Sequence, residues 1–157
     1  MKSARRVRTH LTHSRGQALV EFALVAPIFF FVLLAILEGS RFVLFYEALN
    51  NATREGARYA IVHGSNAECA SGPMPAGETP KLWLCYDAAG DKVVQRVQDA
   101  AFGIMGSGIL VTPIWPTDNG RDSEVQVTAS YTYRTLVPFL PLPPITVTAE
   151  SNLVINN

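Results

Sequence analysis

The feature that most constrains this chain is a long apolar run near its N-terminus. No charged side chain occurs from Phe22 to Leu37. Extending the run to Ala18 gives 20 residues, or about 30 Å of helix at 1.5 Å per residue. This length matches the hydrocarbon core of a bilayer. The sequence therefore predicts one transmembrane helix over residues 18–37, surrounded by the lipid bilayer.

The charges are distributed unevenly along the chain although their sum is zero. Residues 1–16 hold five basic side chains and no acidic one, whereas the remainder holds eight basic and thirteen acidic side chains. Basic flanks stay on the cytoplasmic side of a membrane, so we expect the N-terminus in the cytoplasm and the C-terminal part outside. The acidic balance of the main body argues against nucleic acid as a partner. Cleavage as a signal peptide is disfavoured, because residues 35–40 make a poor signal-peptidase site.

A single carboxylate, Glu21, lies at the start of the apolar run. Placing a carboxylate near the core of a membrane costs roughly 2.5 to 3.5 kcal/mol, so Glu21 needs a partner or a purpose. Two interpretations remain open. Glu21 pairs with a positive charge of a neighbouring subunit, or it reaches the cytoplasmic surface or Arg15 within its own chain.

The helical pattern continues beyond the apolar run and predicts one helix over residues 17–63. Apolar or small residues recur at alternating steps of three and four, at Phe42, Phe45, Leu49, Ala52, Gly56 and Tyr59. This stripe needs a partner, which is either the chain's own globular domain, other subunits, or both.

Residues 65–81 are rich in Gly, Pro and Ser, and predict a surface loop. Cys69 and Cys85 bracket this loop, and disulfides persist outside the cytoplasm. We expect a bridge between them that stabilises the fold by roughly 3 kcal/mol. A zinc site is the weaker reading, because His63 is the only histidine outside the basic leader.

The C-terminal half predicts an α+β fold, with a second short helix over residues 87–102 and a small antiparallel β-meander. The expected strands are residues 109–114, 124–134 and 145–150. We expect an exposed hairpin turn at residues 118–120 and a stiff proline-rich connection over residues 138–144. The turn composition would also suit calcium, with candidate ligands Asp118, Asn119, Asp122 and Glu124.

No motif for nucleophilic, metal-dependent or phosphate-binding catalysis occurs in the chain. We therefore expect no enzymatic activity, no cofactor and no metal.

Two stretches resemble a known family. A basic leader ending in Gly16 and Gln17, with Glu21 and Phe22 opening the apolar helix, resembles the type IV prepilin site of the Flp or Tad class. Residues 52–60, ATREGARYA, resemble the helix signature of TadE-like proteins, which here comprises Arg54, Glu55, Gly56 and Arg58. The Tyr- and Thr-rich strand before the proline-rich bend is similar to their C-terminal portion.

This resemblance implies cleavage between Gly16 and Gln17 by a prepilin peptidase. The domains would be a leader (1–16), a long N-terminal helix (17–63) and an extracytoplasmic, pilin-like α+β domain (64–157). The protein would be a minor pilin or pseudopilin of a tight-adherence (Flp/Tad) pilus system in a bacterial inner membrane. Its partners would be other pilin subunits and the inner-membrane assembly machinery. Glu21 and Phe22 would then dock the helix among those subunits.

The docking chemistry follows from charge. Cleavage would leave a free amine on Gln17, one helical turn from Glu21, and opposite charges in a low dielectric satisfy each other. The alternative is a permanently anchored periplasmic binding or adhesin domain that keeps its leader.

Overall fold

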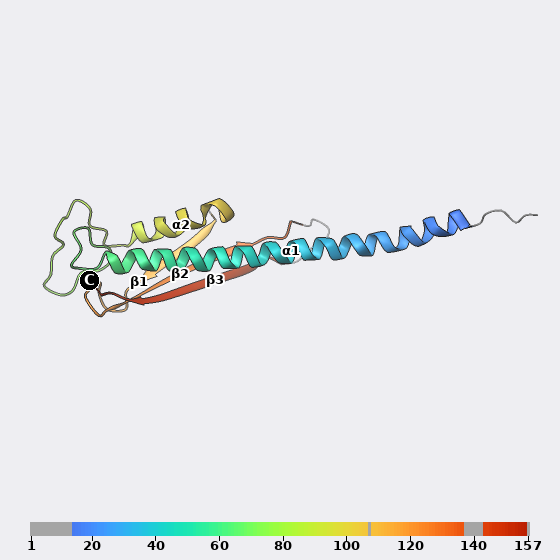
Figure 1. The fold of residues 1–157 in the computed structure, drawn as a ribbon. Helices are drawn as coiled ribbons and strands as arrows, with labels where there is room; N and C mark the ends of the chain where they lie inside the picture. Colours follow the sequence, from blue (N-terminus) through green and yellow to red (C-terminus); the bar gives the residue numbers. More distant parts are fainter. Residues whose placement is uncertain (1–13, 107, 137–142, 157) are drawn as a thin grey trace, which may run out of the picture. The chain divides into compact units, whose positions relative to one another are not determined.

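The computed structural model describes residues 14–106, 108–136 and 143–156, without the side chains of residues 14, 15 and 102. The predicted leader up to residue 13 and most of the predicted proline-rich connection lie outside this part of the chain. The elements, labelled in Figure 1, are α1 (Ser14–Val62), α2 (Asp91–Met105), β1 (Ile109–Ile114), β2 (Glu124–Tyr133) and β3 (Ile145–Val154). This is the α+β fold that the sequence predicts.

Helix α1 has 49 residues and continues through Pro27. The chain divides into two compact units within this helix, Met1–Leu37 and Glu38–Asn157. In the first unit the apolar side chains from Leu19 onward are mostly exposed. The helix is long and apolar enough to cross a membrane, so its first part fits a single-pass membrane anchor.

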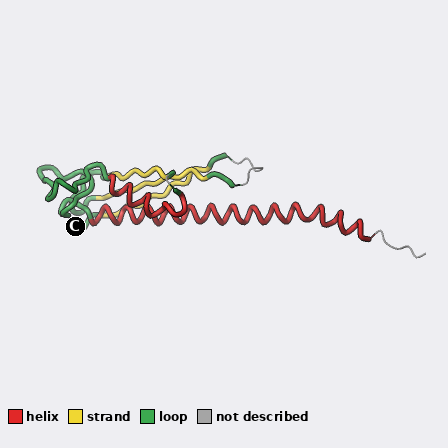
Figure 2. The backbone as a smooth tube through the Cα atoms, turned by 90° about the horizontal axis from the view of Figure 1, so that it is seen from above, coloured by secondary structure: helices red, strands yellow, loops and turns green. Residues whose placement is uncertain are grey.

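The second unit is built on a three-stranded antiparallel sheet in the order β1-β2-β3. Side chains alternate along β2, so that Val125, Val127 and Ala129 are buried and their neighbours are not. Figures 1 and 2 show the second half of α1 beside both α2 and the sheet. Strand β3 runs to Val154, beyond the predicted end at residue 150, because its whole length pairs with β2.

Helix α2 begins four residues later than predicted. The Asp87 carboxylate accepts hydrogen bonds from the backbone N–H groups of Gly90, Asp91 and Lys92 at 2.8 to 3.0 Å, and so caps the helix start. The helix ends at Met105 and is followed by Gly106, which has a φ of +63°, a conformation that suits glycine. The buried face of α2 runs through Val93, Val97, Ala101 and Met105, and Ala100 is exposed.

The predicted exposed turn at residues 118–120 is wrong in one respect, because Asn119 is fully buried. Its side-chain Nδ2 donates to the carbonyl oxygen of Ser71 at 3.0 Å, and its backbone bonds to Ser65 and Pro73. The turn therefore fastens the 65–81 loop to the sheet. Asp118 accepts from Ser123 Oγ and from the backbone N–H of Gly120, and these hydrogen bonds lower the pKa of its carboxyl group.

Candidate functional site

The predicted processing site lies in the first turn of α1, which begins at Ser14. Gly16 and Gln17 are both exposed, and no atom lies within 4 Å of where a Cβ on Gly16 would be. Glu21 lies one helical turn after Gln17, so the two residues share a face of the helix. Glu21 and Phe22 are also exposed. This segment is therefore accessible to other proteins. The alternative, in which Glu21 pairs with Arg15 of its own chain, involves a side chain outside the described residues.

The signature segment divides its residues between two faces of α1. Arg54, Glu55 and Arg58 are exposed, whereas Gly56 is buried. A Cβ on Gly56 would stand 2.3 Å from Val97 Cγ2 of α2 and 3.6 Å from Val127 Cγ1 of β2. Only glycine permits α1 to approach this closely. The small residue of the signature is therefore the place where α1 meets α2 and the sheet.

The residues beside Gly56 on the buried face are also small or tightly bonded. Ala52, Ala57 and Ala60 are at most 1% exposed, and buried Thr53 Oγ1 donates to the carbonyl oxygen of Leu49 at 2.6 Å. The predicted apolar stripe on this part of α1 therefore packs against the chain's own domain. The opposite, charged face remains free for other contacts.

Sequence reasoning missed a polar cluster at the start of the second unit, which we call the Glu38 cluster: Glu38, Arg41, Tyr133 and Leu136. The Tyr133 hydroxyl donates to Glu38 Oε1 at 2.6 Å, and the Leu136 backbone N–H donates to the same oxygen at 3.1 Å. Arg41 Nη1 lies 3.3 Å from Glu38 Oε2. These contacts join the end of β2 to α1 directly after the predicted membrane span.

The surroundings of the Glu38 cluster are aromatic. Phe42 and Phe45 each meet the Tyr133 ring edge-on, at centroid distances of 5.5 and 5.4 Å, and Phe45 stacks on Tyr131. The Arg41 guanidinium lies over the rings of Phe45 and Tyr133 at 5.8 and 5.7 Å, within the range of cation–π attraction. Glu38 and Arg41, the first charges after the apolar run and three residues apart, were the available sequence signal.

The pKa values of the two acidic groups in this cluster are shifted in opposite directions. The hydrogen bond from Tyr133 is the main cause that lowers the pKa of Glu38, and Leu136 and Arg41 lower it further. Partial burial raises this pKa but does not outweigh them. Burial, helped by the hydrogen bond to Glu38, raises the pKa of Tyr133 to about 12. The contact is therefore made between a carboxylate and a neutral phenol.

The stability of the second unit should depend on this contact at both ends of the pH scale. The lowered pKa of Glu38 stabilises the fold above the unfolded pKa of about 4.3, and this stabilisation is lost as pH falls through the folded value. The raised pKa of Tyr133 stabilises it below about pH 10, and this is lost as pH rises through about 12. Denaturation midpoints of the full chain in detergent should fall at both extremes. Tyr133→Phe should make the denaturation midpoint less dependent on pH at both extremes. An unchanged pH profile in this variant would contradict the prediction.

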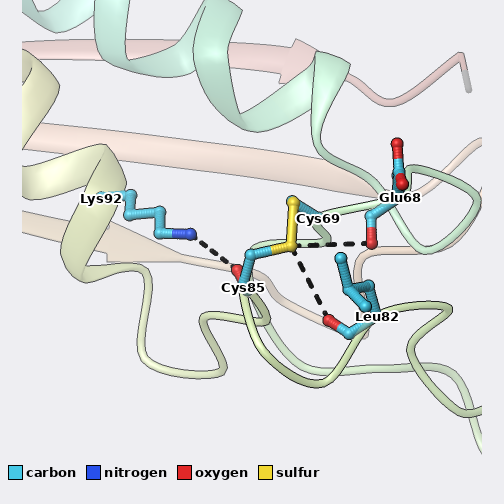
Figure 3. Close-up of a disulfide and its surroundings, with 5 residues drawn as sticks. All are labelled: Glu68, Cys69, Leu82, Cys85 and Lys92. Atoms are coloured by element: carbon cyan, nitrogen blue, oxygen red, sulfur yellow. Dashed lines mark hydrogen bonds between the residues drawn. A yellow bond between two sulfur atoms is a disulfide. The ribbon is translucent and has the colours of Figure 1, made fainter.

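The predicted disulfide is present between Cys69 and Cys85, with their Cα atoms 5.2 Å apart. Figure 3 shows Lys92 of α2 reaching this bridge, where its Nζ donates to the carbonyl oxygen of Cys85 at 2.6 Å. Beyond the bridge, Gly72 and Gly90 have positive φ values and lie against the Trp115 ring. The disulfide therefore closes the irregular segment between residues 69 and 85, and Lys92 joins that segment to α2.

Replacing both cysteines by serine should lower the free energy of unfolding by about 2–3 kcal/mol, because the unfolded chain would regain the freedom of the closed loop. Denaturant titration of the full chain in detergent, with and without a reductant, measures this. The reductant should destabilise the parent protein and leave the double variant unchanged. Equal stability of parent and variant would contradict the structural role.

A shallow hollow of about 290 Å³ lies where α1 faces α2, lined by Tyr59, Lys92, Gln95, Arg96 and Asp99. The Arg96 guanidinium lies 5.6 Å from the centre of the Tyr59 ring, which also stacks on His63. Among the described residues no group of three side chains is placed to hold a metal ion. The hollow has a lining of mainly charged side chains.

Comparison with known proteins adds one finding. Residues 16–58 match the family model of TadE-like proteins, a range that contains the predicted processing site, the apolar run and most of the signature segment. No curated protein and no solved structure matches the chain. Over residues 16–58 the chain is similar to TadE-like proteins, and this similarity suggests a component of the Tad pilus system.

Proposed function

We propose that this protein is a minor pilin or pseudopilin of a tight-adherence (Flp/Tad) pilus assembly system and not an enzyme. In this proposal a prepilin peptidase cuts between Gly16 and Gln17, and the chain joins other subunits through α1. The N-terminus lies in the cytoplasm, and the second unit lies outside the inner membrane. The TadE-like match over residues 16–58 supports the pilus context.

The observation that carries the proposal is the division of α1 into two parts with different surroundings. From Glu38 onward the helix uses its small and apolar residues to pack against its own domain. Before Glu38 large apolar side chains are exposed around the helix, among them Phe22, Leu24, Phe29 and Phe30. Such a surface needs lipid before assembly and can be covered by neighbouring helices afterwards.

The proposed docking chemistry uses Gln17 and Glu21. Cleavage would leave a positive α-amino group on Gln17, and the Glu21 carboxylate of a neighbour would neutralise it inside the low-dielectric helix bundle. Because the interaction of two charges falls with their separation, the pair would favour one axial position of each entering subunit. Phe22, which is exposed, would pack beside this pair.

The exposed face of α1 beyond the membrane offers a second surface for subunits. It combines apolar Val43 and Leu44 with charged Glu47, Arg54 and Arg58, all of them exposed. This face is opposite the one that Gly56 and its neighbours bury. We propose that other pilins or the inner-membrane assembly machinery contact it.

Leader removal is the decisive test. The intact mass of the chain recovered from membranes should lack residues 1–16 in cells with an active prepilin peptidase, and should retain them when the peptidase is deleted. Gly16→Leu should block the mass change in active cells, whereas Gly39→Leu should not. A full-length mass in active cells would instead support the alternative, a permanently anchored periplasmic binding or adhesin domain.

A further inference from the structure

We infer that the end of the β2–β3 hairpin is a second membrane-contact site, which touches the outer surface of the bilayer that residues 18–37 span. The described residues of this site, which we call the hairpin end, are Leu136, Pro143, Pro144 and Ile145. The inference rests on the proposed membrane position of residues 18–37. Its partner is lipid, at the level of the headgroups and the first carbons of the acyl chains.

The position of Glu38 in the sequence places the hairpin end at the membrane boundary. Leu37 ends the uncharged run, and Glu38 is the next residue, so Glu38 lies at the membrane boundary in any orientation of the two units. The Leu136 N–H donates to the Glu38 carboxylate at 3.1 Å. Ile145 is the cross-strand partner of Tyr133, whose hydroxyl donates to the same carboxylate at 2.6 Å. The hairpin end is therefore held at the boundary by direct hydrogen bonds.

The hairpin end is exposed and carries no charge. Leu136 is 72% exposed and Ile145 is 43% exposed, and Pro143 and Pro144 are exposed as well. No charged residue occurs in the sequence from Thr135 to Ala149. Exposed leucine and isoleucine at this level would otherwise be in contact with water, whereas their burial among acyl chains is favourable.

The charged side chains beside the hairpin end also suit a membrane boundary. The side chain of Glu38 is 15% exposed, and its carboxylate accepts hydrogen bonds from Tyr133 and Leu136 and pairs with Arg41. Such pairing suits a carboxylate close to hydrocarbon. Arg134, next to Tyr133, is exposed. Arginine at a membrane boundary reaches the phosphates of the headgroups.

Strand β3 itself provides a matched test. Its two ends, Ile145 and Val154, are 43% and 44% exposed, and they are about 30 Å apart at 3.3 Å per residue. The full-length chain carrying Trp83→Phe is reconstituted in vesicles of phosphatidylethanolamine and phosphatidylglycerol. Ile145→Trp, Leu136→Trp and Val154→Trp are compared in this background, with and without lipids brominated near the headgroup end of the acyl chain.

All variants retain Trp115, so the emission of the Trp83→Phe background is subtracted. The added tryptophan at residue 145 or 136 should then emit at shorter wavelength than the one at residue 154. Brominated lipid should quench it about twofold, while the tryptophan at residue 154 stays unquenched. Equal, unquenched emission from all three variants would overturn the inference. Shorter-wavelength emission without quenching would also overturn it, because a neighbouring protein would then cover the hairpin end.

The same samples separate this inference from the proposed membrane anchor. Co-flotation of the chain with the vesicles after alkaline washing reports insertion of residues 18–37. A chain that floats while residues 136 and 145 stay unquenched overturns the hairpin contact alone. A chain that does not float overturns both proposals.

Discussion

Gly56→Leu is expected to lower the free energy of unfolding of the second unit by about 3 kcal/mol or more. A Cβ at this position would lie 2.3 Å from Val97 Cγ2. Val97 is fully buried, and a β-branched side chain in a helix has essentially one rotamer, so it cannot turn away. The leucine would force α1 and α2 apart and expose the core between them. Near-UV circular dichroism during denaturant titration of the full chain in detergent measures the loss.

Gly39→Leu is the matched control, because it places the same substitution in the same helix. Nothing lies within 4 Å of a Cβ on Gly39, and leucine has a higher helix propensity than glycine by up to about 1 kcal/mol. This variant should be neutral or slightly more stable. Gly56→Ala adds only the Cβ that meets Val97 Cγ2. Val97→Ala should therefore restore part of the stability that Gly56→Ala loses. Equal losses at residues 56 and 39 would show that Gly56 does not set the helix spacing.

The elements of this fold with strong periodicity could be predicted from the sequence. The second half of α1 and strand β2 each bury one regular face. The observed ends of α1 and β2 lie within three residues of the predicted ones. The start of α2 could not be placed from periodicity, because Asp87 reads as a helical residue and instead caps the helix from outside. Local pattern does not distinguish a capping carboxylate from one in the first turn.

The parts that sequence reasoning missed depend on contacts between distant residues. Asn119 looks like an exposed turn residue, and its burial depends on a hydrogen bond to Ser71, 48 residues away. Glu38 looks like the end of an apolar run, and its role depends on Tyr133, 95 residues away. Gly56 appeared only as one member of a family signature, and its packing role became visible from the position of Val97. Such pairs carry no periodic signal in one sequence.

Glu21→Ala is expected to reduce incorporation of the processed chain into assembled pilus material by about a hundredfold, while leader removal persists. The loss corresponds to leaving the Gln17 amine without its partner in a low dielectric, which costs about 3 kcal/mol. Membrane insertion should not suffer, because removing the carboxylate relieves a cost of roughly 2.5 to 3.5 kcal/mol. Quantitative immunoblots of sheared pili and of membranes, together with the intact mass, measure incorporation and processing separately.

Glu78→Ala is the control for this prediction, because it removes an exposed carboxylate from the 65–81 loop, outside the surfaces proposed for subunit contact. A hydrated surface charge contributes about 0–1 kcal/mol, so incorporation should change little. Glu21→Asp keeps the charge and shortens the side chain, and it should fall between the parent and Glu21→Ala. Full incorporation of Glu21→Ala would show that Glu21 is held at the cytoplasmic surface and has no partner in the assembly. The subunits would then be held together by apolar packing of residues such as Phe22, which is less directional than an ion pair.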